Sequence, residues 1–100
     1  MKNIIVHINK VFESRLRLGI MSLLMIHEKM DFNTMKEQLN ITDGNLATHI
    51  IALEKSRYVQ VRKSFNGRKP HTTYMATAVG RKAFKDHLDA LEKLIKNNRM

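Results

Sequence analysis

One change of hydrophobic period constrains the fold of this chain most strongly. Before residue 58 the apolar residues recur every three or four positions, which is typical of amphipathic helices. From residue 58 to Phe65 they alternate, with Val59, Val61 and Phe65 on one face, which is typical of a half-buried strand. The sequence therefore predicts a strand at this point of an otherwise helical chain.

A hairpin is predicted directly after this strand. Asn66-Gly67 is the strongest short hairpin signal, because both residues tolerate the positive φ that a type I′ turn requires. Residues 71–77 are rich in Thr and Tyr and form the predicted returning strand, while Pro70 confines its start to an edge or a loop. The segment 68–71 is therefore expected to be an exposed basic tip.

Helices are predicted on both sides of the hairpin. Residues 30–32 leave room only for a turn or a minimal strand, and Asn33 or Thr34 is the expected N-cap of the helix that follows. Thr77 is the expected N-cap of the last helix, which runs to about Asn97. The four predicted helices cover residues 13–29, 34–39, 43–56 and 77–97.

This order of elements is that of a winged helix-turn-helix domain. One hundred residues are enough for about one domain, so the whole chain, 1–100, is assigned to it. The helix-turn-helix is predicted at 34–56 and the wing at 58–77. The predicted fold class is mainly α with a small β-hairpin, with helical N- and C-terminal dimerisation segments at 1–12 and 84–97.

The positive charge is concentrated in one part of the chain. The formal net charge is +9, and residues 55–85 hold nine Lys and Arg and no Asp or Glu. The rest of the chain has equal numbers of bases and acids. Basic surface can serve solubility alone, but solubility does not require such segregation, so the pattern favours a polyanionic partner such as nucleic acid.

Two segments resemble a known family of regulators. Residues 42–55 followed by Tyr58-Val59 are similar to the recognition-helix region of MarR/ArsR-type bacterial transcriptional regulators, and residues 65–81 resemble their wing and the Thr-x-x-Gly start of the next helix. The resemblance extends over residues 13 to 95. It implies a DNA-binding transcription regulator that acts as a homodimer on double-stranded DNA. Many relatives have Gly where this chain has Arg57, which leaves the end of the third helix open.

The third helix is expected to lie in the major groove. Its apolar positions Leu46, Ile50 and Leu53 face the core, so the opposite positions face the bases. His49 lies at the flank, where it is either a hydrogen-bonded structural residue or, as the resemblance implies, a residue that faces DNA. Ile51 is expected to pack against the second helix, with a thymine-methyl contact as the alternative. The predicted base-reading residues are Gly44, Asn45, Thr48, His49 and Ala52.

Electrostatic affinity must come from outside the third helix, because Lys55 is its one outward cation. Arg68 at the hairpin tip suits a narrow minor groove, where the potential is most negative. Arg81 and Lys82 begin the last helix, whose N-terminal N–H groups favour a phosphate. The predicted contacts to the DNA backbone, mainly in the wing, are Lys55, Arg62, Lys63, Asn66, Arg68, Lys69, His71, Arg81 and Lys82.

Two apolar stripes near the chain termini are candidates for a dimer seam. They could instead cover the core of the domain itself, but three helices and a hairpin already serve that core, so the dimer is favoured. The predicted interface residues are Ile5, Ile8, Phe12, Phe84, Leu88, Leu91 and Ile95.

Several other classes of protein are disfavoured by residues that the sequence lacks. There is no Cys, the five His are scattered, and no nucleophile or phosphate-loop motif occurs, so no catalytic site, metal or cofactor is predicted. No apolar run is long enough for a membrane span, and a cytoplasmic protein is expected. Two alternatives remain: a winged helix that binds an acidic protein partner, and RNA binding, for which stacking aromatics are scarce. The sequence names no small-molecule effector.

Overall fold

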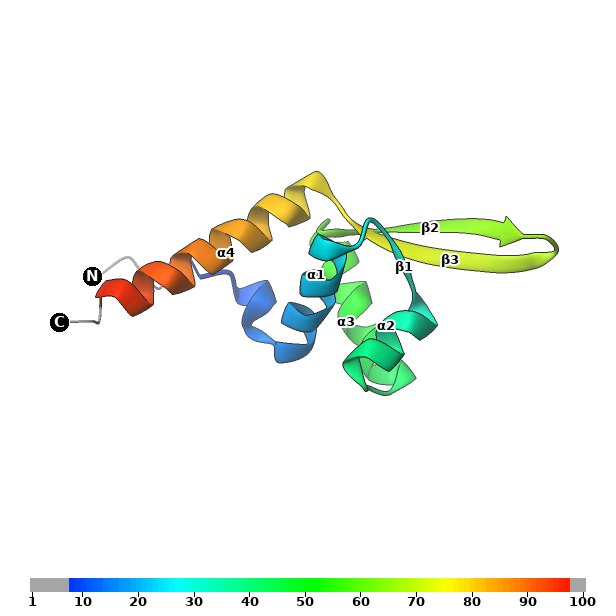
Figure 1. The fold of residues 1–100 in the computed structure, drawn as a ribbon, viewed down its shortest axis with the longest axis horizontal. Helices are drawn as coiled ribbons and strands as arrows, with labels where there is room; N and C mark the ends of the chain where they lie inside the picture. Colours follow the sequence, from blue (N-terminus) through cyan, green and yellow to red (C-terminus); the bar gives the residue numbers. More distant parts are fainter. Residues whose placement is uncertain (1–7, 98–100) are drawn as a thin grey trace.

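The computed structural model describes residues 8–97 and has the predicted fold class, with four α-helices and a three-stranded antiparallel sheet of order β1-β3-β2. Helices α1 to α3 form a body from which the β2–β3 hairpin and α4 project in opposite directions (Figure 1). The elements are η2 (Lys10–Glu13), α1 (Arg15–Ile26), β1 (Met30–Asp31), α2 (Phe32–Leu39), α3 (Asp43–Lys55), β2 (Val59–Asn66), β3 (Lys69–Ala76) and α4 (Ala78–Asn97).

Polar side chains set where the helices begin. Thr42 caps α3 by accepting the N–H of Asn45, and Thr77 accepts the N–H of Gly80 at 2.9 Å, which confirms the predicted cap of α4. The predicted cap of α2 is wrong. Its N-cap is Asp31, whose carboxylate accepts the N–H of Thr34 at 2.7 Å, so α2 begins two residues earlier than expected. That hydrogen bond also lowers the pKa of Asp31, since a helix N-terminus favours negative charge.

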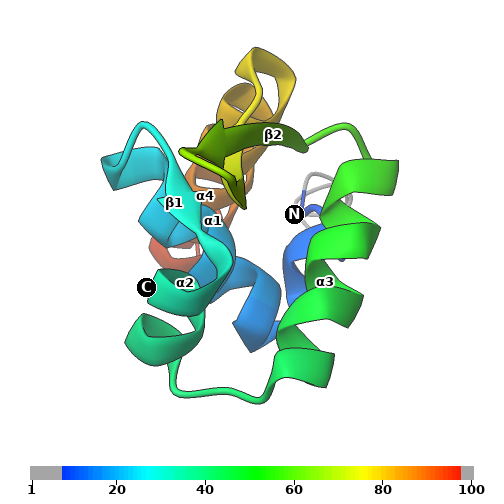
Figure 2. The same cartoon turned by 90° about the vertical axis from the view of Figure 1, so that its right-hand side faces the viewer.

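The core lies between the three body helices and the inner end of the hairpin. Helices α2 and α3 are joined by a tight turn, and α1 packs against both (Figure 2). Phe12 is fully buried, and its ring lies 5.2 Å from the rings of both Tyr58 and Phe84. This aromatic cluster attaches the start of the described chain and α4 to the base of the hairpin.

The hairpin turn lies one residue further along than predicted. Asn66 pairs with Lys69 in the ladder, so the two-residue loop is Gly67-Arg68 and not Asn66-Gly67. Gly67 has φ +68°, whereas neither Asn66 nor Arg68 has a positive φ. A positive φ at the first loop residue alone belongs to a type II′ turn, for which Gly in that position is the usual residue.

The junction between α3 and α4 explains two parts of the family pattern. Arg57 follows the end of α3 with φ +64°, the left-handed conformation that a Gly adopts without strain. Helix α3 therefore ends at Lys55 even without Gly. The hydroxyl of Thr77 donates to the carbonyl of Arg57 at 2.7 Å, and a Cβ on Gly80 would lie 2.2 Å from the carbonyl oxygen of Tyr58. Only Gly fits there.

Candidate nucleic-acid interface

The outer face of α3 carries most of the predicted base-reading residues. Leu46, Ile50 and Leu53 are buried in the core, as predicted. On the other side of the helix Gly44, Asn45 and Thr48 are exposed, and Ala52 is half-buried. The hydroxyl of Thr48 donates to the carbonyl of Gly44 at 2.9 Å, which leaves its methyl group and the amide of Asn45 available to a ligand.

His49 is held by a partner within the domain. Its Nδ1 accepts the Nε–H of Arg17 in α1 at 3.1 Å, and the same guanidinium reaches the carbonyl of Val11 at 3.4 Å. Burial lowers the pKa of His49, and the nearby charge of Arg17 lowers it further. His49 is therefore a hydrogen-bonded structural residue, which is one of the two roles expected for it. A neutral ring that accepts at Nδ1 carries its proton on Nε2.

Ile51 is placed differently from the expectation. It was expected to pack against the second helix, but half of it (51%) is exposed, and it lies on the outer face of α3 between Thr48 and Lys55. Lys55 is exposed in the last turn of α3. The outer face therefore combines polar groups, one cation and one aliphatic side chain.

The hairpin presents the predicted basic residues to solvent. Arg62, Lys63, Arg68 and Lys69 are all exposed, as is Asn66. Within residues 8–97 no acid forms an ion pair with these four bases. The ladder pairs Lys63 with Thr72 and Arg62 with Thr73, so the bases occupy both faces of the hairpin, with Arg68 in the turn. The hairpin is thus a cationic projection without internal neutralisation.

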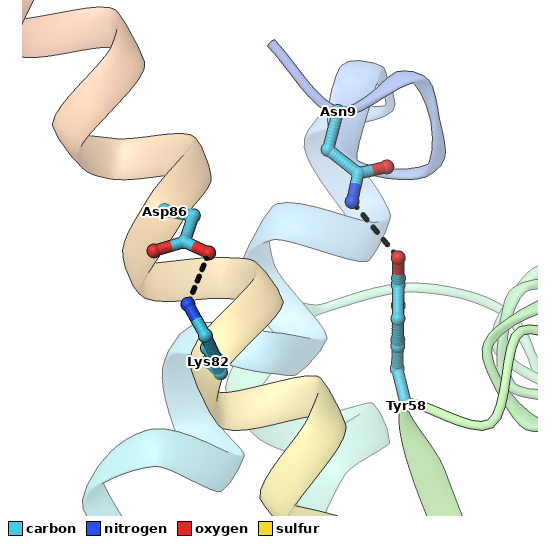
Figure 3. A network of polar contacts seen from close by, with 4 residues as sticks. All are labelled: Asn9, Tyr58, Lys82 and Asp86. Carbon is cyan, nitrogen blue, oxygen red and sulfur yellow. Dashed lines mark hydrogen bonds and ion pairs between the residues drawn. The ribbon is translucent and has the colours of Figure 1, made fainter. Parts of the chain in front are cut away.

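Three residues of the predicted backbone set are placed differently from the exposed bases of the hairpin. Arg81 donates to the carbonyls of Leu24 at 3.1 Å and Met25 at 3.3 Å, so its charge stabilises the C-terminal end of α1 and does not face outward as expected. Lys82 forms an ion pair with Asp86 at 2.9 Å (Figure 3). His71 is half-buried in β3, opposite Ser64 and closer to the turn than to the base of the hairpin, and it lines a hollow of about 340 Å³ together with Asp31.

The predicted dimer seam is divided by the structure. Phe12 and Phe84 lie in the core of the domain itself and have no surface left for a partner, which corrects their assignment to an interface. Leu88 and Ile95 remain 46% and 63% exposed on α4, and Leu91 is half-buried between them. Ile8 is half-buried, and Ile5 lies outside the described residues.

Polar contacts attach the segment before η2 to the rest of the domain, which sequence patterns did not reveal. The side-chain amide of Asn9 donates to the hydroxyl of Tyr58 at 2.9 Å (Figure 3), and its backbone N–H donates to Nδ1 of His87 at 3.0 Å. His87 is 3% exposed, and burial lowers its pKa against the opposing effect of Glu13. The partners of these two hydrogen bonds are separated by 78 and 49 positions in the sequence, so no local sequence pattern predicts them.

The part of the chain that the structure describes offers neither a cluster of three or more His, Cys, Asp or Glu for a metal nor a helix long and apolar enough to cross a membrane. The fold and this cationic face define a winged helix-turn-helix domain.

The chain belongs to the winged helix DNA-binding domain family, whose profile matches residues 16–95. It is 40% identical over 88 residues to an uncharacterised protein of Methanocaldococcus jannaschii, a match that spans 88% of this chain and 96% of that protein. Its fold is similar to that of a transcriptional regulator homologue from Pyrococcus horikoshii, with a TM-score of 0.86, 30% identity, and coverage of 99% of this chain and 96% of the other.

A MarR-family protein from Enterococcus faecalis has the same fold, with a TM-score of 0.72 and 23% identity over 87% of this chain and 77% of that chain. The predicted resemblance to MarR-like regulators is confirmed at the level of the fold, and the chain carries a winged helix DNA-binding domain.

Proposed function

We propose that this protein is a homodimeric, sequence-specific regulator that reads duplex DNA with α3 in the major groove and holds the neighbouring backbone with the hairpin. The observation that carries the proposal is the cationic hairpin, in which Arg62, Lys63, Arg68 and Lys69 are exposed without ion-pair partners in the described chain. Phosphate contacts of this kind supply most of the affinity of a protein for DNA, and they carry no sequence information.

Sequence reading falls to the outer face of α3. Asn45 presents both a donor and an acceptor, which matches the edge of adenine, and Thr48 and Ile51 offer methyl groups for thymine. The recognition helix of a helix-turn-helix reads bases mainly with its N-terminal residues, where Gly44 and Asn45 lie. His49 donates from Nε2 to an acceptor on the DNA, since Arg17 occupies its other nitrogen.

Dimerisation would use α4. Leu88, Leu91 and Ile95 follow one side of this 20-residue helix, which projects from the body on the side opposite the hairpin (Figure 1). A second copy packed on this stripe would give a two-fold dimer with two α3 helices and two hairpins, as two DNA half-sites require. We expect Leu88→Glu with Ile95→Glu to give monomers in sedimentation. A wild-type protein that sediments as a monomer at micromolar concentration contradicts the dimer.

Selection of bound sites from a random duplex pool tests the proposal as a whole. We expect a palindrome with half-sites about 10 to 10.5 base pairs apart or a multiple of that spacing. Arg68→Ala should weaken binding to all duplexes alike and reduce the salt slope by about 1, whereas Asn45→Ala should relax the preference at one position. Lys93→Ala, which removes an exposed charge from α4, is the matched control and should change neither. Absence of duplex binding at low salt would favour an acidic protein partner.

A further inference from the structure

The outer half of the hairpin carries an aromatic side chain that the domain itself does not use. Phe65 is 76% exposed, one of the most exposed large apolar side chains among the described residues. The ladder places it opposite Pro70, next to the turn. The rest of this outer part of the hairpin bears Lys and Arg. The fold does not require the apolar pair of Phe65 and Pro70 there, because Gly67 and the ladder fix the turn and the register.

The register shows which face of the hairpin carries this pair. Directly paired residues share a face, and side chains alternate along each strand, so Phe65 and Pro70 lie on the same face as the pairs Val61–Tyr74 and Val59–Ala76. The inner end of that face is covered by the domain: Val59 is 4% exposed and Ala76 8%.

The ring of Tyr74, on the same face, lies 6.5 Å from the ring of Phe32 in α2. Burial raises the pKa of Tyr74, and the negative charge of Glu54 in α3 raises it further, which places Glu54 near this side chain. The face therefore looks toward α2 and α3 at its base, and the outer part of the hairpin projects away from the body of the domain (Figure 1).

Charge decides what can cover this apolar pair. Lys63 shares its face and Arg68 lies in the adjacent turn, whereas Arg62 and Lys69 lie on the opposite face of the hairpin. Residues 55–85 contain no acid, so a second copy of the hairpin would be repelled. A polyanion with an apolar interior satisfies both the cations and the ring. Duplex DNA is such a partner, because its phosphates are outside and its stacked bases inside.

We infer that Phe65 is a specificity-determining wedge that enters the minor groove beside the site read by α3 and partly unstacks one base step. Apolar side chains inserted between base pairs unstack and kink a duplex, and pyrimidine–purine steps yield most easily. The wedge rests on the proposed function. It adds sequence preference, for TA or CA/TG steps, at a position where the hairpin makes no base-edge hydrogen bond.

The test uses the duplex recovered by selection from a random pool, with 2-aminopurine at the step that the wing covers. Phe65→Ala should weaken binding by about 5- to 30-fold without changing the salt slope, because it removes apolar contact and no charge. The wild-type protein should raise the 2-aminopurine fluorescence, and Phe65→Ala should not. Phe65→Leu keeps an apolar wedge and should retain most of both effects. Ile26→Ala, which truncates a side chain that is 79% exposed at the end of α1, is the matched control and should bind within twofold of wild type.

The two proposals fail in different ways. If the wild type enriches no duplex from the pool, the proposed function is wrong. If it binds duplex and Phe65→Ala binds within twofold of it with the same fluorescence response, the wedge alone is wrong. Loss of binding to anionic lipid vesicles in Phe65→Ala, with duplex binding unchanged, would assign the aromatic to a membrane surface and would also overturn the wedge.

Discussion

Replacement of Gly80 by Ala tests how the start of α4 is joined to the sheet. A Cβ at this position would lie 2.2 Å from the carbonyl oxygen of Tyr58, more than 1 Å inside ordinary van der Waals contact. That carbonyl cannot move freely, because it accepts the N–H of Thr77 at 3.0 Å. The hydroxyl of Thr77 in turn accepts the N–H of Gly80 and donates to Arg57.

The expected cost follows from these contacts. Overpacking against a fixed backbone costs about 1–3 kcal/mol. Loss of one hydrogen bond of the junction adds about 1 kcal/mol. The better helix propensity of Ala returns about 1 kcal/mol. We therefore expect Gly80→Ala to lower the free energy of unfolding by about 1–3 kcal/mol, which corresponds to a fall of about 4–24 °C in Tm for a domain of this size.

The assay is urea and thermal unfolding followed by circular dichroism at fixed protein concentration, since dimerisation would make Tm depend on concentration. Gly44→Ala is the matched control. Gly44 is in the first turn of α3 with nothing within 4 Å of an added Cβ, so Ala there should stabilise by about 0.5–1 kcal/mol. Equal stability of the two variants would refute the steric reasoning.

Three further predictions concern Arg57, Arg81 and the two histidines whose pKa is lowered by burial. Arg57→Gly should raise the free energy of unfolding in urea by about 0.5–1 kcal/mol by relieving the positive φ, and Arg57→Ala should not. Arg81→Met should lower it by about 1–2 kcal/mol by uncapping α1, with the salt slope of DNA binding unchanged; a changed slope would show that Arg81 contacts phosphate. Burial lowers the pKa of both His49 and His87 below the ordinary value of 6.5, so the unfolded chain takes up these protons first. Stability should therefore be full above about pH 6.5 and fall as the pH drops through the folded pKa values, and His87→Gln should reduce that dependence in urea unfolding at several pH values.

Local patterns were sufficient for the elements and for the cationic part of the interface. The change from helical to alternating periodicity predicted the hairpin, and Leu46, Ile50 and Leu53 predicted the buried side of α3, because one residue in every three or four on a helix faces the core. The exposed bases of the hairpin were predictable for a related reason. Long unpaired cations in a segment without acids have no place in a small core.

The sequence by itself therefore determined the order of elements, the family and the sign of the charged face. The tertiary structure alone decided which residues of each stripe are free. Phe84 shares the helical spacing of Leu88 and Ile95, but its ring packs against Phe12 and is buried, and Phe12 of the N-terminal stripe is buried between Phe84 and Tyr58. Arg81 is as basic as Arg68, yet its guanidinium is used at the end of α1. Contacts between residues far apart in the chain decide such cases, and spacing along one element carries no information about them.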